Sequence, residues 1–541
     1  MSHPIYRQKP LGTWMIPIGL FLGAFVLVAL TTSDYGVAWD EPPYFHASDL
    51  HIQWIADFST DLVHGRIGKS LEDVHIKAAW HGDPYYVPHP PLSRIISGIT
   101  KKFFAPVLDK FVSYRLGPAL FFALLVTVMY LWMTELFDRW TGLFSALALL
   151  LTPNLFGFAH LAVTDMPLAA MWFLTVYCFW KGLKEWRWSF VLGIVWGLAL
   201  STKFPALLIP TPLLFWAHLY RRQSYANNLF SMIFLSPLVM IATQPYLWHQ
   251  TSLRILEFLY EGLSRAYRPD ANLSVFFHNR LYFTYDLPWY YPFFILAVTT
   301  PESILLLALV AALSVGRFKT QRDVTILFLL NALFIPFLGI LPGAVLHDGV
   351  RQLLSALPFI AGLAGAGFFV LVRSVKERVE KMVSLGKIKN LQPKVTLAAF
   401  VLLLFPPAWD LFLYHPYELS YYSRLVGGLR GAYQRGLEVT YFMEVFTPDF
   451  LNFLNEKLPP NAAINASVAN FMLAYYQKEN RLRPDLKIAG NNDRFDYYIL
   501  MTRRSVWSRK ELMLFRTHSP LAAIRVGDVP LVSVYKIGKL D

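Results

Sequence analysis

Residues 12–31 read GTWMIPIGLFLGAFVLVALT, and residues 34–43 read DYGVAWDEPP. The first stretch holds 20 residues without a charged side chain, which is the length that an α-helix needs to cross a bilayer. It lacks a convincing small-residue cleavage site, so we interpret it as a retained membrane anchor and not as a removed signal peptide. The second stretch places two carboxylates just beyond the end of this anchor.

The rest of the chain continues the apolar character of the anchor. Of its 541 residues, 55% are hydrophobic and 16% are charged, whereas soluble domains hold about 25% charged residues. This excludes a disordered protein and an ordinary cytosolic enzyme, and the single cysteine, Cys178, excludes a disulfide scaffold. The apolar runs predict a polytopic α-helical membrane protein with about eleven transmembrane helices, over residues 12–31, 116–136, 141–158, 162–181, 189–202, 205–220, 229–246, 289–314, 323–341, 352–373 and 395–413.

The basic residues predict which side of the membrane each segment faces. With the N-terminus in the cytoplasm, the inner segments carry 18 lysines and arginines, and the short outer turns carry two. This bias follows the rule that cytoplasmic loops are rich in basic residues. It also accounts for much of the formal net charge of +13, so we expect no nucleic-acid partner. Three long segments then face outward, namely residues 32–115, 247–288 and 414–541.

We divide the chain into a transmembrane catalytic region, residues 1–413, and an outer C-terminal domain, residues 414–541. The C-terminal domain has no further apolar span, and it contains runs of residues that favour strands. We expect a small α/β domain, with strands at 496–501, 522–526 and 531–536, a hairpin turn at 527–530 and a helix across 462–478.

The first candidate site is the acidic pair Asp40 and Glu41, which follows the anchor by about nine residues. Pro42 and Pro43 stop any helix that runs into the pair and restrict the backbone. A carboxylate that is partly removed from water is a competent general base. The alternative is an interfacial loop whose acids are simply solvated.

The second candidate site lies in the same outer segment, which continues with residues 85–92, YYVPHPPL. Residues 92–104 are too short to span a bilayer, and they alternate isoleucine and phenylalanine with basic residues, which predicts a helix lying in the interface. His89 and Arg94 could meet a lipid phosphate there. The alternative is a membrane-surface helix whose basic side chains are solvated.

A third candidate is Asp165, in residues 160–167, HLAVTDMP. It falls where the chain turns from the third span into the fourth, on the same side as Asp40. An acid at the membrane boundary is costly and suggests a function. The structural alternative is a helix cap made by Thr164 and Pro167.

Two cations share this side of the membrane, namely Lys203 and Arg351, each in a short outer turn. A cation there needs a partner, and a bound phosphate would supply one. Pairing with Asp348 or Glu302 is the alternative. Further candidates for binding phosphate or substrate are Tyr85, Arg280, Tyr282 and His347, although the aromatics near Arg280 are also typical of an interfacial belt.

The sequence contains no HExxH motif, no cysteine pair, no P-loop and no dinucleotide-binding fingerprint. We therefore expect no metal site and no required cofactor. Whether the reaction uses a divalent cation is left open. A pump with its own nucleotide-binding domain is excluded.

Taken together and in order, these motifs resemble those of the integral-membrane glycosyltransferases of the GT-C fold. The resemblance is to the branch of protein mannosyltransferases and bacterial lipid A aminoarabinose transferases, and it covers most of residues 30–440. The matching stretches are Trp39-Asp-Glu-Pro42, His89-Pro-Pro-Leu92, Thr164-Asp-Met-Pro167, Thr202-Lys203, Leu287-Pro-Trp-Tyr-Tyr-Pro292 and the run from His415 to Gly428.

This resemblance implies an inverting transfer of a sugar from a polyprenyl-phosphate donor to a lipid, glycan or protein acceptor. The reaction would occur on the periplasmic or outer face of a cell membrane. The implied roles are a base at Asp40, an acceptor-holding neighbour at Glu41, a second acid at Asp165, and donor-phosphate contacts at Lys203 and Arg351. His89, Arg94 and Arg280 join this phosphate-binding set.

Two functions of other classes remain open. A transporter or flippase for a lipid-linked sugar is the first, although the sequence shows no paired broken helices. A non-catalytic subunit of a glycan assembly complex is the second.

Overall fold

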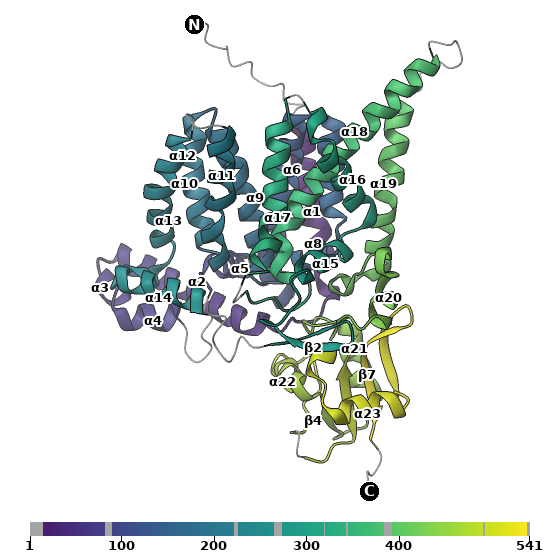
Figure 1. Ribbon diagram of the computed structural model, residues 1–541. Coiled ribbons are helices and arrows are strands. Elements are labelled where there is room, and N and C mark those ends of the chain that lie inside the picture. Colours follow the sequence, from purple (N-terminus) through teal and green to yellow (C-terminus); the bar gives the residue numbers. More distant parts are fainter. Residues whose placement is uncertain are drawn as a thin grey trace.

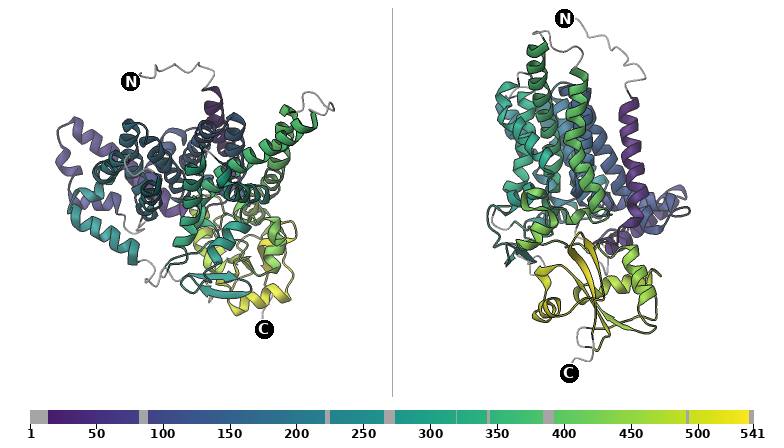
Figure 2. Two further views of the ribbon diagram at one scale, coloured as in Figure 1. Left: turned by 45° about the horizontal axis from the view of Figure 1, so that its top comes forward. Right: turned by 90° about the vertical axis from the view of Figure 1, so that its right-hand side faces the viewer.

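A computed structural model describes residues 14–81, 89–220, 225–264, 273–318, 320–341, 344–383, 392–490 and 493–537. Tyr85 therefore lies outside the described residues. The helices form an upright bundle, and a small α/β region lies below one end of it (Figure 1). Two further views show the same two parts, with α1 along one side of the bundle (Figure 2).

The bundle is built from long and broken helices that run between its two ends. Its core is apolar, and the residues on its outer surface are apolar as well, as a surface facing lipid requires. The helices are α1 (Met15–Thr31), α6 (Lys110–Leu136), α7 (Arg139–Leu150), α8 (Pro153–Ala159), α9 (Asp165–Gly182), α10 (Trp186–Leu200), α11 (Pro210–Tyr220), α12 (Ala226–Phe230), α13 (Ser236–Ala242), α15 (Tyr291–Val298), α16 (Glu302–Leu313), α17 (Arg322–Leu338), α18 (Leu357–Val383) and α19 (Gln392–Tyr414).

The expected eleven spans are not all seen as single helices. Among the described residues, four helices are long and apolar enough to cross a membrane, and six if each bent pair is counted as one span. The four are Met15–Asp34, Lys110–Leu136, Arg351–Val379 and Lys394–Tyr414, and three shorter apolar helices accompany them. The number eleven stays a prediction.

The breaks occur inside runs that the sequence shows as continuously apolar. The expected span 141–158 bends by 67° between α7 and α8, where Pro153 begins the second helix. The expected span 289–314 bends by 120° between α15 and α16, at residues 299–301. A proline in the first turn of a helix is well tolerated, so hydropathy alone does not reveal that a new helix begins there.

A layer of shorter elements covers one end of the bundle, at the level where the α/β region begins (Figure 1). The predicted helix over 92–104 is confirmed by α5, which spans Leu92–Phe104, and its position in the membrane interface stays a prediction. The other elements of the layer are α2 (Glu41–Val63), α3 (Ile67–Ser70), α4 (Asp73–Trp80), α14 (Thr251–Ser264) and the hairpin of β1 (Ser274–Phe277) and β2 (Arg280–Phe283).

The C-terminal region contains a five-stranded sheet in the order β4-β3-β5-β7-β6. The three predicted strands are confirmed as β5, β6 and β7, and the last two form an antiparallel hairpin. The predicted helix across 462–478 is partly wrong, because residues 463–465 form β3 between β4 and β5. The elements are α20 (Gly428–Gln434), α21 (Pro448–Lys457), β3 (Ala463–Asn465), α22 (Asn470–Lys478), β4 (Lys487–Ile488), β5 (Tyr497–Met501), α23 (Arg509–Thr517), β6 (Ala522–Val526) and β7 (Val529–Lys536).

Candidate active site

The loop between α1 and α2 is fixed by a buried ion pair between Glu41 and Arg115. Nε of Arg115 donates to Glu41 Oε1 at 2.8 Å and Nη2 donates to Oε2 at 2.6 Å. The same guanidinium also donates to the carbonyl oxygens of Thr32, Tyr35 and Gly36. Five donors in a rigid fork make arginine suited to such a task. Glu41 additionally accepts hydrogen bonds from the backbone N–H groups of Ala38 and Ala162.

This geometry changes the role expected for Glu41. Its side chain is fully buried, and both of its oxygens already accept hydrogen bonds from the protein. It therefore has no surface to offer to an acceptor, and its position is that of a structural anchor for the loop.

The same loop lies directly against the C-terminal region. The N–H of Gly36 donates to the carbonyl of Glu444 at 3.0 Å, and the N–H of Trp39 donates to the carbonyl of Phe442 at 2.9 Å. A Cβ atom on Gly36 would come within 2.4 Å of the Phe446 carbonyl oxygen, so only glycine permits this close approach. Asp40 directly follows Trp39, so its position is set by contacts between the N-terminal loop and the C-terminal region.

Asp40 belongs to a group of six charged side chains, here called the charged cluster. It comprises three carboxylates and three cations, namely Asp40, Asp165, Asp348, Lys203, Arg351 and Arg503. Asp40 stands at the N-cap of α2 and Asp165 is the first residue of α9. Residues distant in the sequence are thus brought to one place at the end of the bundle.

Arg351 lies at the centre of the charged cluster. Its Nη2 donates to Asp40 Oδ2, its Nε to Asp165 Oδ2 at 3.1 Å, and its Nη1 to Asp348 Oδ2 at 3.2 Å. The guanidinium carbon also stands 4.3 Å from the centre of the Phe442 ring. One buried arginine therefore fixes the relative positions of three carboxylates.

Lys203 binds on the far side of Asp165. Its Nζ donates to Asp165 Oδ1 at 2.8 Å and to Gln352 Oε1 at 3.2 Å. Thr164 occupies the predicted N-cap position of α9, but its side chain makes no capping hydrogen bond, so capping does not account for this motif. The carboxylate of Asp165 holds the two cations instead.

The three carboxylates of the charged cluster differ in their access to solvent. Asp40 keeps 26% of its side-chain surface exposed, whereas Asp165 keeps 1% and Asp348 keeps 6%. Asp348 is held ionised in the loop before α18: burial raises its pKa, but His347, Arg503 and Arg351 outweigh burial and bring the pKa below its usual range. Asp40 is consequently the one carboxylate of the cluster that an incoming molecule can reach.

The expected phosphate role of Lys203 and Arg351 needs revision. The expectation assumed that Lys203 and Arg351 have few other partners. Carboxylates of the protein already neutralise both side chains. The alternative partner Asp348 is found at Arg351, whereas the other alternative, Glu302, binds Arg424. The cluster is formally balanced, so a phosphate would have to compete with these carboxylates for Lys203 and Arg351.

Basic side chains are instead found in a neighbouring cavity of about 580 Å³ between α4, α5 and α14, here called the interface cavity. His89 and Arg94 line it, and Arg254 of α14 joins them. Its remaining walls are Trp80, His81, Pro90, Pro91, Gln244, Tyr246, Leu247, Glu257, Phe258 and Glu261.

Tyr44 lies between the interface cavity and the charged cluster. It follows Asp40 by one helical turn on α2, and the guanidinium carbon of Arg94 stands 5.8 Å from the centre of its ring. Arg94 is in turn fixed by donating to the His89 carbonyl at 2.6 Å and to His51 at 3.2 Å. One turn of α2 therefore connects the reachable carboxylate with the basic cavity.

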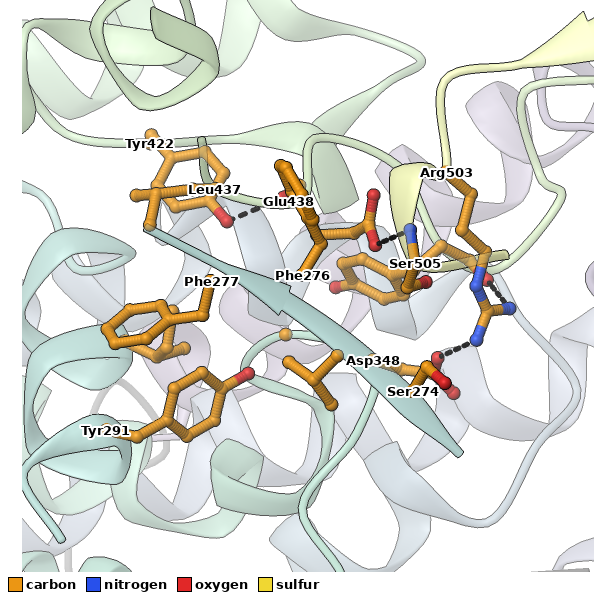
Figure 3. Close-up of a pocket in the computed structure, with 14 residues that line it drawn as sticks. Ser274, Phe276, Phe277, Tyr291, Asp348, Tyr422, Leu437, Glu438, Arg503 and Ser505 are labelled. Carbon is orange, nitrogen blue, oxygen red and sulfur yellow. Dashed lines mark hydrogen bonds and ion pairs between the residues drawn. The ribbon is translucent and has the colours of Figure 1, made fainter. Parts of the chain in front are cut away.

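The remaining sequence candidates fall in other places. His347 lies beside Asp348, with its Nδ1 2.8 Å from Asp348 Oδ2. Arg280 and Tyr282 stand on β2 of the hairpin, where Arg280 is exposed, and no hydrogen bond between the described residues joins either to the charged cluster. A second cavity of about 360 Å³ separates this hairpin from the C-terminal region, and Asp348, Glu438 and Arg503 line it (Figure 3). Within the described residues, no three potential ligands lie close enough to hold a metal ion.

Sequence reasoning missed four contributors to the site: Arg115, Arg254, Gln352 and Arg503. Arg115 directly precedes an expected span and could have been flagged as a charge that needs a buried partner. Nothing in the sequence marks Arg503, which sits in an ordinary turn of the C-terminal region.

Comparisons with known proteins agree with the predicted resemblance. Residues 46–249 match the family model of dolichyl-phosphate-mannose-protein mannosyltransferase. The range includes His89, Arg94, Asp165 and Lys203 and begins just after Asp40. No curated protein matches the chain.

Two solved structures of ArnT from Cupriavidus metallidurans share the fold. The one bound to undecaprenyl phosphate has 15% sequence identity and a TM-score of 0.53, and the alignment covers 97% of this chain and 98% of that chain. The apo structure has 14% identity and a TM-score of 0.51 over the same shares of the two chains. The predicted GT-C fold is thereby confirmed, and the long apolar helices of the chain agree with the predicted membrane location.

Proposed function

We propose that this chain is an inverting glycosyltransferase that moves a sugar from a polyprenyl-phosphate donor to an acceptor at the outer face of a cell membrane. The observation that carries the proposal is the position of Asp40. Its carboxylate is the reachable one of the charged cluster, and Tyr44, one helical turn further along α2, contacts Arg94, which lines the interface cavity.

The interface cavity suits the phosphate of such a donor. His89, Arg94 and Arg254 line it together with the carboxylates of Glu257 and Glu261. Arginine and histidine bind phosphate oxygens through charge-assisted hydrogen bonds. The cavity lies beside the interface helix α5, so a polyprenyl tail can remain in the bilayer while its phosphate enters. Support comes also from ArnT, the fold neighbour whose solved structure contains undecaprenyl phosphate.

Asp40 would then act as the general base. The acceptor hydroxyl or amine gives its proton to the Asp40 carboxylate while its oxygen or nitrogen forms a bond to the anomeric carbon. The bond from that carbon to the phosphate oxygen breaks on the opposite face, and the electron pair leaves with the lipid phosphate. General-base assistance of this kind contributes about 10²–10⁴-fold in rate.

The rest of the charged cluster keeps this base in place. Arg351 holds the Asp40 carboxylate and is itself held by Asp165 and Asp348. A catalytic group fixed in advance spares the reaction the cost of ordering it in the transition state. The scheme uses no cofactor. We also propose that the N-terminus lies in the cytoplasm and that the C-terminal domain lies outside.

The test uses the purified protein in lipid nanodiscs with a panel of undecaprenyl-phosphate sugars and a lipid and cell-wall extract as the source of acceptor. Mass spectrometry should detect free undecaprenyl phosphate, and NMR of the product should show an inverted anomeric centre. Donors that are recovered intact here but are moved across the bilayer when the protein is reconstituted in closed vesicles would favour a flippase. If no donor of the panel is consumed, the proposal is contradicted.

A further inference from the structure

Arg503 reaches the charged cluster from the C-terminal region. It follows β5, and its Nη2 donates to Asp348 Oδ1 at 3.1 Å while its Nη1 donates to the Tyr441 carbonyl at 2.7 Å. Figure 3 shows the guanidinium pointing at Asp348, with the interaction between them drawn. The outer sheet region thus contributes a side chain to a cluster that otherwise comes from the membrane-embedded part and its loops.

The turn that carries Arg503 is itself firmly held. The Glu438 carboxylate accepts hydrogen bonds from the N–H of Arg504 at 2.6 Å and from the N–H of Ser505 at 2.9 Å. Arg503 is buried, and its Nε has no hydrogen-bond partner within the described part of the chain. Buried donors are rarely left unsatisfied. Because Nε makes no hydrogen bond, the two Nη contacts fix the position of this guanidinium.

Asp348 shares its carboxylate among two arginines and His347. Oδ1 accepts from Arg503, whereas Oδ2 accepts from Arg351, the residue that holds Asp40, and lies 2.8 Å from His347 Nδ1. If Arg503 is removed, Oδ1 becomes a buried and uncompensated acceptor, which is strongly unfavourable. The cheapest relief is for Asp348 to take both of its hydrogen bonds from Arg351, and this would draw the guanidinium away from Asp40.

We infer that Arg503 is a positioning residue for the reaction, because it keeps Asp348 from competing with Asp40 for Arg351. The inference rests on the proposed function, since it concerns the placement of the proposed base. It assigns the C-terminal region a part in turnover beyond covering the end of the bundle.

The test compares Arg503→Met with Arg504→Met, the matched control from the same turn. The Arg504 guanidinium stacks on the Tyr433 ring at 3.9 Å and belongs to neither the cluster nor the two cavities. With the donor that the wild type consumes, Arg503→Met should lower kcat about tenfold with the donor KM unchanged, as expected for a base displaced from its working position. Arg504→Met should keep the wild-type kcat, and Arg503→Lys should recover part of the loss because it keeps the charge.

A double-mutant cycle with Asp348→Asn separates positioning from simple support of the fold. Asparagine carries no charge to compete for Arg351, so Arg503→Met should lower kcat little further once Asp348→Asn is present. The loss of kcat in the double mutant should therefore be about tenfold smaller than the product of the two single losses. Losses that multiply fully, or a kcat for Arg503→Met equal to that of Arg504→Met, overturn the inference.

If Arg503→Met does not fold, Arg503→Lys against Arg504→Lys carries the same comparison, and equal kcat values again contradict the inference. Failure of the proposed function is recognised separately, because the wild type itself would then consume no donor.

Discussion

Asp40 and Arg351 stand 311 positions apart in the chain and form a salt bridge in which the aspartate is partly exposed and the arginine is buried. The asymmetry matters because the buried partner also holds Asp165 and Asp348. Asp165 and Asp348 therefore fix the buried Arg351, and the exposed part of the Asp40 side chain remains accessible to an incoming molecule.

Asp40→Asn keeps the shape of the side chain and removes the proton acceptor. We expect turnover to fall by about 10²-fold or more, because general-base assistance is lost, while donor binding changes little. The measurement is release of undecaprenyl phosphate by purified protein. Asp34→Asn is the matched control, since Asp34 lies in the same loop but binds His415. Near-normal turnover of Asp40→Asn with a normal fold would move the base role to another residue.

Glu41→Gln should act on stability more than on chemistry. It leaves the buried Arg115 guanidinium without its counter-charge, which costs about 3–5 kcal/mol when one partner of a buried pair is removed. Thermal unfolding in nanodiscs should show the loss, and Glu41→Gln combined with Arg115→Met should recover part of it. A stable Glu41→Gln protein with a raised KM for the acceptor would instead restore the acceptor-holding role.

His89→Ala should weaken use of the donor. His89 lines the interface cavity, and a charge-assisted hydrogen bond to phosphate is worth about 1.5–3 kcal/mol, so we expect the donor KM to rise by about tenfold or more with little change in kcat. His75→Ala is the control, because His75 belongs to the same outer segment but pairs with Glu72 on the surface. Equal KM values for the two variants would place the phosphate elsewhere.

Stability should fall at alkaline pH because of His415. Its ring nitrogens lie 2.8 Å from Glu418 Oε1 and 3.0 Å from Asp34 Oδ2. Burial lowers the pKa of His415, but Glu418 and Asp34 outweigh burial and raise it to about 9.

Since this folded pKa lies above the ordinary value of 6.5, the stabilisation is complete below that value and is lost as pH rises through about 9. The unfolding temperature of the wild type should drop over this range more than that of His415→Gln. Parallel curves for the two proteins would exclude the effect.

Membrane orientation can be tested with reporter fusions. The 18 basic residues of the expected inner segments predict that the C-terminus lies outside, because basic loops stay in the cytoplasm. Alkaline phosphatase fused after Asp541 should be active, whereas the same enzyme fused within the expected inner turn at residues 137–140 should be inactive. The reverse pattern would place the charged cluster on the cytoplasmic side.

Periodic and local features were predictable from the sequence. The helix over residues 92–104 and the three late strands follow from side-chain alternation that each element shows by itself. The bends near Pro153 and at residues 299–301 were not predictable, because the apolar character continues across them. Strand β3 was missed because its identity comes from its neighbours β4 and β5, which lie later in the sequence.

The candidate site was predictable as a set of residues but not as a set of pairs. Order along the chain and a shared side of the membrane were enough to select Asp40, Asp165, Lys203 and Arg351. Their partnership with one another was not foreseen, since a sequence does not show which acid meets which base. Asp40 and Glu41 illustrate the difficulty, because adjacent carboxylates meet entirely different arginines.

The spread of the charged cluster along the chain has a consequence for biosynthesis. Asp40 is translated long before Arg351, and Arg503 is translated later still, roughly 20–90 s after Asp40 at the usual pace of about 5–20 residues per second. For the first two thirds of that interval Asp40 lacks Arg351, the arginine that holds it, and for all of it the charged cluster lacks Arg503. We therefore expect ribosome-bound chains and C-terminally truncated fragments to be catalytically silent, so that lipid-linked sugar is consumed only by finished molecules.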